Sequence, residues 1–370
     1  MPKNKKIRVC LLFGGKSGEH EVSLQSAKSI YEKLDKEKYD VLLVGIDKDG
    51  QWLLGDAANY LLNEENPKLI ALNKVNAKPV TAIVKQESAE LISIQSGKGL
   101  GSVDVFFPIT HGTYGEDGAL QGFLELLDTA YVGAGVLGSA VGMDKDVMKK
   151  LFKDAGLEVG KYVAGTRKTL TSDALQTAIK ELGFPIFVKP ANLGSSVGIS
   201  KAKNEEDLKA AMDDAFQYDT KIVLEEFIPG REIELSVLGN DEPIASIPGE
   251  VLPNHEFYSY EAKYIDENGA GLEIPAKISE DKVKEVQKLA VRAFQSLDLL
   301  GMARADFFLK SDGAFVVNEV NTLPGFTKIS MYPKLWELTG IPFSELLDKL
   351  IELAIEKRAE KDKLKRTFDI

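Results

Sequence analysis

The residues best suited to chemistry lie near the C-terminus, in two short runs that predict a pair of strands joined by a turn. The runs span residues 301–310 and 314–321, with Ser311, Asp312 and Gly313 between them. Side chains alternate along a strand, so Arg304 and Asp306 share one face, and Glu319 and Asn321 share another. Three oxygen ligands and a guanidinium thus converge on a two-strand platform. This set suits Mg²⁺ bound together with a polyphosphate, because Mg²⁺ takes oxygen ligands and keeps positions open for phosphate.

A plainer interpretation is that these carboxylates are solvated, as charges at the ends of exposed strands commonly are. Asp306 and Glu319, however, sit among apolar residues in both runs. These apolar neighbours are Phe307, Phe308, Val316, Val317 and Val320. Charges in such strands are rarely buried without a partner or a metal, so the group as a whole favours a metal and nucleotide site.

A second motif places Lys189 just before a loop of glycine and serine at residues 194–198. Glycines let backbone N–H groups approach phosphate oxygens, Ser195 and Ser196 add hydroxyl donors, and the lysine supplies the countercharge. The segment lacks the GxxxxGK[ST] pattern, so it is not a Walker P-loop. A glycine–serine loop alone is also typical of an ordinary turn. Following apolar strands and a lysine, it predicts a hairpin that closes over a triphosphate.

Two further lysines and one strand end are candidates for the same pocket. Lys145 and Lys263 could join it, although either one alone is typical of a solvated surface lysine. Residues 225–228 end an apolar strand, where backbone groups could hydrogen-bond the edge of an adenine. Phe227 and Ile228 would then line the face of the base.

Composition sets the outer limits of the interpretation. A chain of 370 residues exceeds one ordinary domain, and 44% hydrophobic with 28% charged residues is typical of a soluble protein. The net charge of −11 argues against a broad nucleic-acid or anionic-membrane surface. The single cysteine, Cys10, lies in an apolar run and rules out an internal disulfide framework. With no stretch of transmembrane length and no signal-peptide pattern, we expect a cytoplasmic protein with no membrane partner.

The elements expected to position these residues are those of an α/β protein. In the first region we expect strands at 7–13, 41–46 and 103–107, and a helix at 22–34. Polar loops at 14–21 and 110–118 follow two of these strands, and ligands of open α/β sheets bind at such strand ends.

Later elements are expected in two further regions. Asp144 is a candidate N-cap for a helix whose apolar positions follow the helical repeat. Strands are expected at 184–188 and 222–228, and helices at 204–217 and 344–357. The charged tail at 356–366 predicts a solvated helix end.

Four motifs together resemble D-alanine–D-alanine ligases, members of the ATP-grasp superfamily. The motifs are Gly14–Ser23, His111–Gly118, Tyr258–Tyr264 and Asn318–Gly325. They occur in family order along nearly the whole chain. The resemblance implies an α/β (α+β) ATP-grasp fold with an N-terminal Rossmann-like parallel-sheet domain. We expect domains at 1–133, 134–224 and 225–370, the last carrying the metal site.

The resemblance also implies a reaction and its nucleotide site. ATP would phosphorylate the carboxylate of one D-alanine, and the amine of a second would attack the acyl phosphate. The implied metal ligands, for two Mg²⁺ ions with Mn²⁺ as an alternative, are Asp306, Glu319 and Asn321. The implied ATP-binding residues are Lys145, Lys189, Ser195, Ser196, Glu225, Glu226, Phe227, Ile228, Glu232, Lys263, Phe308 and Asn318.

Substrate and catalytic roles follow from the same resemblance. Glu19 would hold the ammonium of the first D-alanine, and Ser195 and Tyr264 would hydrogen-bond to Glu19 to lock the loops shut. The remaining roles are an oxyanion site of Arg304 and the Gly325 N–H, a second-carboxylate site of Ser330 and Lys263, and His111 near the first carboxylate.

Several alternatives stay open from the sequence. The chain could be another ATP-grasp ligase, one that uses D-serine or D-lactate as second substrate, or a nucleotide-binding regulator without turnover. Tyr264 favours an amine as second substrate, because relatives that use D-lactate carry phenylalanine there. A dinucleotide-dependent oxidoreductase is disfavoured, because the segment after the first strand lacks GxGxxG. The resemblance further suggests a homodimer formed through the N-terminal region.

Overall fold

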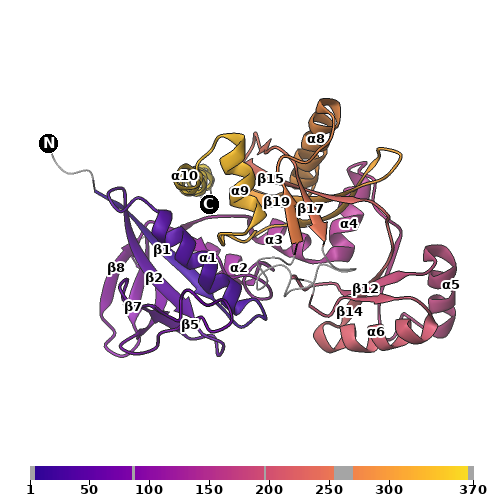
Figure 1. Cartoon of the computed structure of the whole chain (residues 1–370). Helices are drawn as coiled ribbons and strands as arrows, with labels where there is room; N and C mark the ends of the chain where they lie inside the picture. The colour runs from indigo at the N-terminus through magenta and orange to yellow at the C-terminus, as the bar shows by residue number, and fades with distance from the viewer. Residues whose placement is uncertain (1–4, 86–87, 196, 254–269, 366–370) are drawn as a thin grey trace.

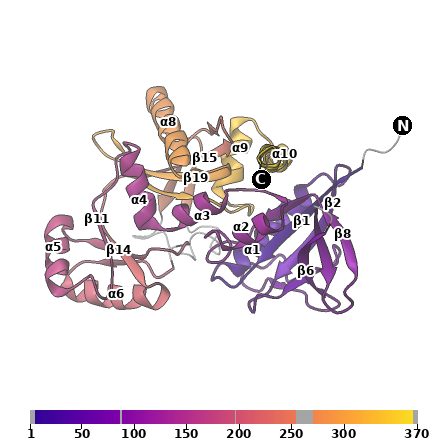
Figure 2. The same cartoon turned by 180° about the vertical axis from the view of Figure 1, so that it is seen from behind.

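The structure, a computed structural model, describes residues 5–85, 88–195, 197–253 and 270–365. Three main sheets lie in three neighbouring regions of the molecule, and the view from behind shows the same separation (Figures 1 and 2). Within the described residues, no helix is long and apolar enough to cross a membrane.

The N-terminal region is built on an eight-stranded sheet. Its order is β10 (Ala130–Tyr131), β9 (Val105–Pro108), β1 (Ile7–Gly14), β2 (Tyr39–Ile46), β3 (Trp52–Leu54), β6 (Lys78–Lys85), β7 (Ser88–Ser93) and β8 (Gly99–Val103). The first four strands pair in parallel, and the remaining strands extend the sheet antiparallel. Strand β1 is apolar and buried from Val9 to Phe13, because both of its faces are covered there, as is typical of parallel strands. A two-stranded sheet of β4 (Leu61–Leu62) and β5 (Ala71–Leu72) accompanies it.

Two loops of this region carry the polar motifs after β1 and β9. The predicted strands at 7–13 and 41–46 are confirmed, and the helix expected at 22–34 is α1 (His20–Lys33). The strand expected at 103–107 is wrong in its start, because Val103 ends β8 and β9 begins at Val105. The loop after β9 leads into α2 (Ala119–Leu126).

The second sheet is a four-stranded antiparallel sheet. Its order is β11 (Tyr162–Thr166), β14 (Lys221–Glu226), β12 (Ile186–Pro190) and β13 (Ser200–Ala202). Two helices, α5 (Ser172–Leu182) and α6 (Glu205–Tyr218), bury their apolar faces against it in one core. The predicted strands at 184–188 and 222–228 and the helix at 204–217 are confirmed within a few residues at each end. The sheet carries Lys189 and Glu225 on adjacent strands, which pair Lys189 with Val223 and Phe187 with Glu225.

The third sheet carries the predicted hairpin. Its order is β18 (Ala270–Glu273), β17 (Gly249–Pro253), β15 (Arg231–Gly239), β19 (Gly301–Leu309) and β20 (Phe315–Asn321), with β16 (Ile244–Ala245) paired to β15. Helices α3 (Val136–Met143), α8 (Glu280–Ser296) and α9 (Met331–Thr339) pack around it. Side chains of α8 and α4 (Lys145–Asp154) share one buried core with this sheet.

Helix α4 positions two lysines of the site. It begins as predicted after Asp144, whose carboxylate accepts hydrogen bonds from the backbone N–H groups of Asp146 and Val147, each 3.1 Å long. Met148 and Phe152 are fully buried in the core of the third sheet. This packing fixes the direction of the remaining faces of the helix.

The C-terminal helix corrects one prediction. Helix α10 (Phe343–Asp362) runs five residues beyond the expected end, and its charged tail is not simply solvated. Arg358 contacts Asp128 at 2.6 Å, Lys361 pairs with Glu125, and Lys357 is buried over the ring of Tyr131. The tail therefore docks on the N-terminal region, because opposite charges from α2 and the residues after it face it. The division of the chain at residues 133 and 224 stays a prediction.

Candidate active site

The hairpin of β19 and β20 brings four predicted residues onto one face. Arg304 lies opposite Asn321, and Asp306 lies opposite Glu319 in the strand register. Cross-strand partners point to the same side of a sheet. The two pairs, assigned to separate faces when each strand was considered alone, therefore lie together.

A β-bulge interrupts this register at the site. Asp306 pairs with Glu319 but Phe307 pairs with Val317, which leaves Asn318 as the extra residue of β20. Bulges of this kind redirect a strand and are common next to active sites. Here the bulge places the backbone carbonyl of Asn318 3.1 Å from the Nζ of Lys149 on α4.

Arg304 is held by two carboxylates. Its Nε and Nη2 donate to the two oxygens of Asp306 at 2.8 and 2.7 Å, and Nε lies 3.1 Å from Glu234 on β15. Glu234 was missed from the sequence, although it alternates with Glu232 along β15 and lies opposite Asp306 in the register. Since the guanidinium is planar and forked, these contacts fix its direction.

The donor set of the hairpin fits a hard divalent cation. Asp306 is buried at 2% exposure, and the amide of Asn321 lies 3.4 Å from its carboxylate. Within the described ranges, no group of three or more His, Cys, Asp or Glu side chains is placed to hold a metal by itself. A cation at Asp306, Glu319 and Asn321 would thus take oxygen ligands only and would need further oxygens from a bound phosphate.

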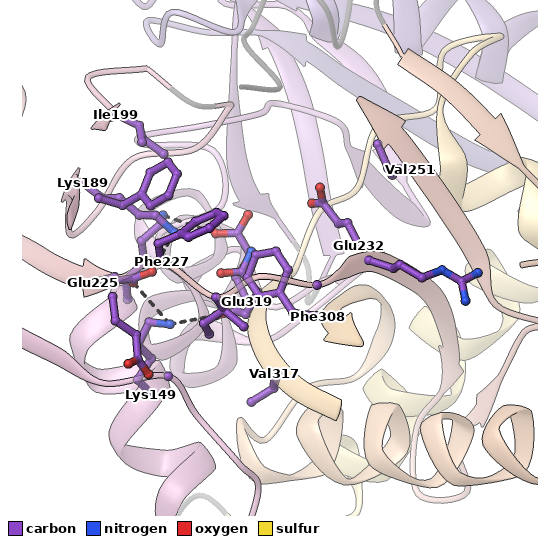
Figure 3. A pocket seen from close by; sticks show the side chains of 18 of the residues that line it. Lys149, Lys189, Ile199, Glu225, Phe227, Glu232, Val251, Phe308, Val317 and Glu319 are labelled. Carbon is purple, nitrogen blue, oxygen red and sulfur yellow. Dashed lines mark hydrogen bonds and ion pairs between the residues drawn. The ribbon is translucent and has the colours of Figure 1, made fainter. Parts of the chain in front are cut away.

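A cavity of about 420 Å³ lies between the second and third sheets, beside the hairpin (Figure 3). A pocket of this size suits a small organic ligand. It brings together ten of the predicted ATP-binding residues, from five different strands, one helix and two loops. They are Lys145, Lys189, Ser195, Glu225, Glu226, Phe227, Ile228, Glu232, Phe308 and Asn318. The other two, Ser196 and Lys263, lie outside the described residues, as does Tyr264.

The floor of the cavity holds a buried charge cluster, which we call the lysine cluster: Lys149, Glu225 and Lys189. The two carboxylate oxygens of Glu225 lie 3.2 Å from Lys149 and 2.8 Å from Lys189, and Figure 3 shows the three side chains turned toward one another. Burial opposes the charge on Glu225, but the two ammonium groups outweigh it and lower the pKa of Glu225 to about 2.

The two lysines respond differently to the shared carboxylate. Burial lowers the pKa of Lys149 despite the nearby Glu225. For Lys189 burial acts in the same direction, but Glu225 and Glu319 outweigh it and raise the pKa. Lys149 was missed from the sequence. The signal was present, because it stands one helical turn after Lys145 and between buried Met148 and Phe152.

On the other side of the site, the glycine–serine loop meets the loop after β1. The Oγ of Ser195 donates to the carboxylate of Glu19, which supports the predicted lock between them. Ser195 has φ of +51°, a conformation that non-glycine residues adopt rarely and mostly at functional sites. Lys145 steadies the same loop, since its Nζ donates to the carbonyl of Leu193 at 2.6 Å and lies 3.8 Å from Glu319.

A second buried carboxylate, Glu116, joins Glu19 and Ser195 in what we call the loop cluster. A methyl group placed on Gly194 would lie 3.1 Å from Glu19 and 3.7 Å from Glu116, so both carboxylates reach the same part of the loop. Glu116 accepts the N–H of Gly112 at 2.8 Å. Burial, then the charge of Glu19, raise the pKa of Glu116 to about 8. Glu116 was missed from the sequence, although it lies within the motif His111–Gly118.

His111 is buried and bridges two regions. Its Nδ1 lies 3.0 Å from the carbonyl of Leu323, which can only accept, so Nδ1 carries the hydrogen. The other ring nitrogen, Nε2, is then left to accept from the Oγ of Ser26 at 3.2 Å. Burial lowers the pKa of His111 to about 4, so the ring is neutral near pH 7. A direct contact with substrate stays a prediction, because both nitrogens have protein partners.

Leu323 begins the segment that carries the remaining predicted residues. A methyl on Gly325 would lie 2.8 Å from the Oγ of Ser330, so these two residues are close together. That hydroxyl accepts the N–H of Thr327 at 2.9 Å. The chain therefore folds back on itself between Gly325 and Ser330, a few residues after β20 ends at Asn321.

Comparison with known proteins finds relatives along nearly the whole chain. The family described as D-ala D-ala ligase N-terminus matches residues 8–134, and that described as D-ala D-ala ligase C-terminus matches residues 151–352. The D-alanine–D-alanine ligase of Oceanobacillus iheyensis is 54% identical over 363 residues, which cover 97% of this chain and 98% of that protein.

Solved structures agree with these matches. The D-alanine–D-alanine ligase of Coxiella burnetii superimposes with a TM-score of 0.84 at 39% identity, covering 97% of this chain and 96% of that one. The VanG D-Ala:D-Ser ligase of Enterococcus faecalis gives 0.82 at 36% identity, covering 95% and 100%. The expected ATP-grasp fold is thereby confirmed. This chain belongs to the D-alanine–D-alanine ligase family.

Proposed function

We propose that this chain joins two D-alanines into D-alanyl-D-alanine with ATP, through an acyl phosphate, as a step of peptidoglycan precursor synthesis. The observation that carries the proposal is the single face of Arg304, Asp306, Glu319 and Asn321 beside a lysine-lined cavity. A carboxylate is a poor electrophile, so it must be activated before an amine attacks. A site that gathers oxygen ligands and cations next to a nucleotide-sized cavity suits that activation.

The proposed nucleotide site is the cavity between the second and third sheets. Lys145 and Lys189 would contact phosphates, and the strand end from Glu225 to Ile228, with Glu232, would hold the nucleoside. Phe308 and Asn318 line the same cavity. Asp306, Glu319 and Asn321 would hold Mg²⁺, as two ions with Mn²⁺ as a substitute, whose charge would offset that of the phosphates when bound.

The proposed substrate site lies between the loop cluster and the hairpin. Glu19 would bind the ammonium of the first D-alanine, and Ser195 would close the glycine–serine loop by its bond to Glu19. Arg304 and the Gly325 N–H would stabilise the oxyanion, and Ser330 would bind the carboxylate of the second D-alanine. Closure matters because the acyl phosphate would hydrolyse in bulk water. Lys263 and Tyr264 complete the proposal outside the described residues.

The named relatives use different second substrates. The VanG structure is that of a D-Ala:D-Ser ligase, so the overall fold alone does not fix the nucleophile. We assign D-alanine for two reasons. The similar relatives are D-alanine–D-alanine ligases, and position 264 is a tyrosine, which the resemblance associates with an amine as second substrate. A Tyr264→Phe variant should raise the ratio of depsipeptide to dipeptide when D-lactate competes with D-alanine at neutral pH.

Phosphate release with product identification tests the assignment. Purified protein with ATP and Mg²⁺ should release phosphate when D-alanine is supplied and form D-alanyl-D-alanine, which mass spectrometry would identify. Mixtures of D-alanine with D-serine or D-lactate should give mainly the D-alanine dimer. Phosphate release only with another pair would move the specificity while keeping the reaction, and ATP binding without any release would favour a regulator.

We also propose a cytoplasmic homodimer formed through the N-terminal region. Large apolar side chains are exposed on α2 of this region and on α3, the helix that contacts it, with Leu126 at 80% and Leu137 at 59%. Such exposure on neighbouring helices is typical of an interaction surface. Light scattering on the wild type should give twice the chain mass, and Leu126→Lys should shift it toward the monomer.

A further inference from the structure

The lysine cluster contains Lys149 in addition to Lys189, and Lys149 is not among the proposed phosphate contacts. Lys149 is 3% exposed, lines the cavity, and lies on α4 one turn after Lys145. Two ammonium groups flank one carboxylate, that of Glu225. Glu319 also acts on both lysines, but it is a proposed metal ligand. The anion expected to neutralise the second ammonium group in this cavity is therefore a polyphosphate.

Lys149 is also the better anchored of the two lysines. Its Nζ contacts Glu225 at 3.2 Å and donates to the carbonyl of Asn318, the bulged residue of β20, at 3.1 Å. It lies 5.9 Å from the centre of the Tyr162 ring. These partners come from β14, β20 and β11, so Lys149 is fixed by three separate strands.

Lys189, by contrast, is both the partner of Glu225 and a proposed phosphate contact. Its Nζ lies 2.8 Å from the carboxylate of Glu225, and the same ammonium group would have to bind a phosphate of the nucleotide. If Lys189 were the single cation beside Glu225, turning toward a phosphate would leave a buried carboxylate without a countercharge. Leaving one partner of a buried pair alone costs more than the pair itself contributes.

We propose that Lys149 is a positioning residue for nucleotide binding, which holds the charge of Glu225 and so releases Lys189 to the polyphosphate. This inference rests on the proposed function of the cavity as the ATP site. It assigns Lys149 no contact with the reacting atoms. Its effect should therefore fall on nucleotide affinity and on KM for ATP, while kcat at saturating ATP changes little.

Lys149→Met tests the proposal directly. It should weaken binding of the magnesium complex of adenylyl imidodiphosphate, measured by calorimetry, by about 10–100-fold, because Glu225 then retains Lys189. Lys149→Arg keeps the charge and should retain most of the affinity. The matched control is Lys153→Met on the same helix, since Lys153 lies over the same Tyr162 ring but is exposed. It should bind within about twofold of wild type.

The double variant Lys149→Met with Glu225→Gln separates this role from a purely structural one. Removing the carboxylate frees Lys189 again, so the double variant should bind the nucleotide more tightly than Lys149→Met alone. If Lys149 only ties α4 to the sheets, the double variant should bind no better than the single one, which would overturn the proposal. Unchanged affinity in Lys149→Met would overturn it as well.

Urea denaturation without nucleotide serves as the folding control for every variant. The assay also separates this inference from the proposed function. Nucleotide binding needs no turnover. A wild type that binds the analogue but forms no D-alanyl-D-alanine would therefore refute the proposed reaction, and the role of Lys149 would still be tested by the nucleotide affinities of the variants. A wild type that does not bind the analogue would refute both.

Discussion

Two buried glutamates on opposite sides of the active site have their pKa values shifted in opposite directions. Glu225 lies between two ammonium groups in the lysine cluster, and its pKa falls to about 2. Glu116 lies beside Glu19 in the loop cluster, and its pKa rises to about 8. Both side chains are equally buried, at 7% exposure. Desolvation alone therefore does not decide the charge of a buried carboxylate, because positive neighbours lower its pKa and negative neighbours raise it.

The two clusters suit opposite parts of the proposed reaction. The lysine cluster is rich in positive charge and faces the cavity assigned to a polyanion. The loop cluster offers the carboxylate of Glu19, which is assigned to a substrate ammonium, beside the protonated side chain of Glu116. Each cluster thus offers the charge that its proposed ligand lacks.

Neither Glu225 nor Glu116 is proposed to contact the reacting atoms. We therefore expect the largest loss of turnover from a substitution at Arg304, which belongs to neither cluster. Arg304→Ala removes the proposed oxyanion donor and should lower kcat by about 10²–10³, as for other oxyanion donors. Phosphate release with D-alanine measures it. Arg304 also pairs with Asp306 and Glu234, so circular dichroism must show that the variant is folded. Near-normal turnover in a folded variant would remove Arg304 from the oxyanion assignment.

The next largest effect should be on stability in the lysine cluster. Glu225→Gln removes the charge that balances Lys149 and Lys189 and should lower the free energy of unfolding near pH 7 by about 3 kcal/mol, from the size of the pKa shift. The folded pKa of Glu225 is depressed, so its stabilisation is present above the ordinary value of 4.5 and is lost as pH falls through 2. The difference between the urea midpoints of wild type and Glu225→Gln should therefore become smaller as the pH is lowered from 5 to 2.

Glu116 should show the opposite pH dependence. Its raised pKa means that the folded protein holds a proton that the unfolded chain releases between pH 4.5 and pH 8, so its contribution to stability falls as pH rises. Glu116→Gln removes this titration and keeps an oxygen for the Gly112 N–H. The variant should gain about 1–3 kcal/mol relative to wild type between pH 5 and pH 9. Parallel urea midpoints across this range would mean that Glu116 is ionised throughout.

The smallest effect should come from the Ser195 hydroxyl, which joins the glycine–serine loop to Glu19. Ser195→Ala removes the donor to Glu19 and should raise KM for D-alanine about tenfold, the scale of one hydrogen bond to a charged group. The matched control is Ser311→Ala in the exposed hairpin turn, which should leave KM unchanged. Equal KM values in the two variants would mean that the loop closes without this bond.

Much of the site could be predicted from residue types and periodicity. The hairpin, the N-cap at Asp144 and the strand before Lys189 follow from local patterns, and the structure confirms them. The start of β9 was missed because β8 and β9 follow one another directly, with apolar residues on both sides of Asp104. The docking of the charged tail of α10 was missed because a charged helix end has the same local pattern whether it meets solvent or Asp128 and Glu125.

The sequence alone determined which residue types were available and their order along the chain, because strand alternation and helical repeat are local properties. It placed Arg304 with Asp306 and Glu319 with Asn321, but only the register of β19 and β20 put both pairs on one face. Tertiary structure alone brought Lys149 to Glu225 and Glu116 to Glu19. A glutamate has the same ordinary pKa wherever it occurs in the sequence, and its charge is decided by neighbours that only folding assembles.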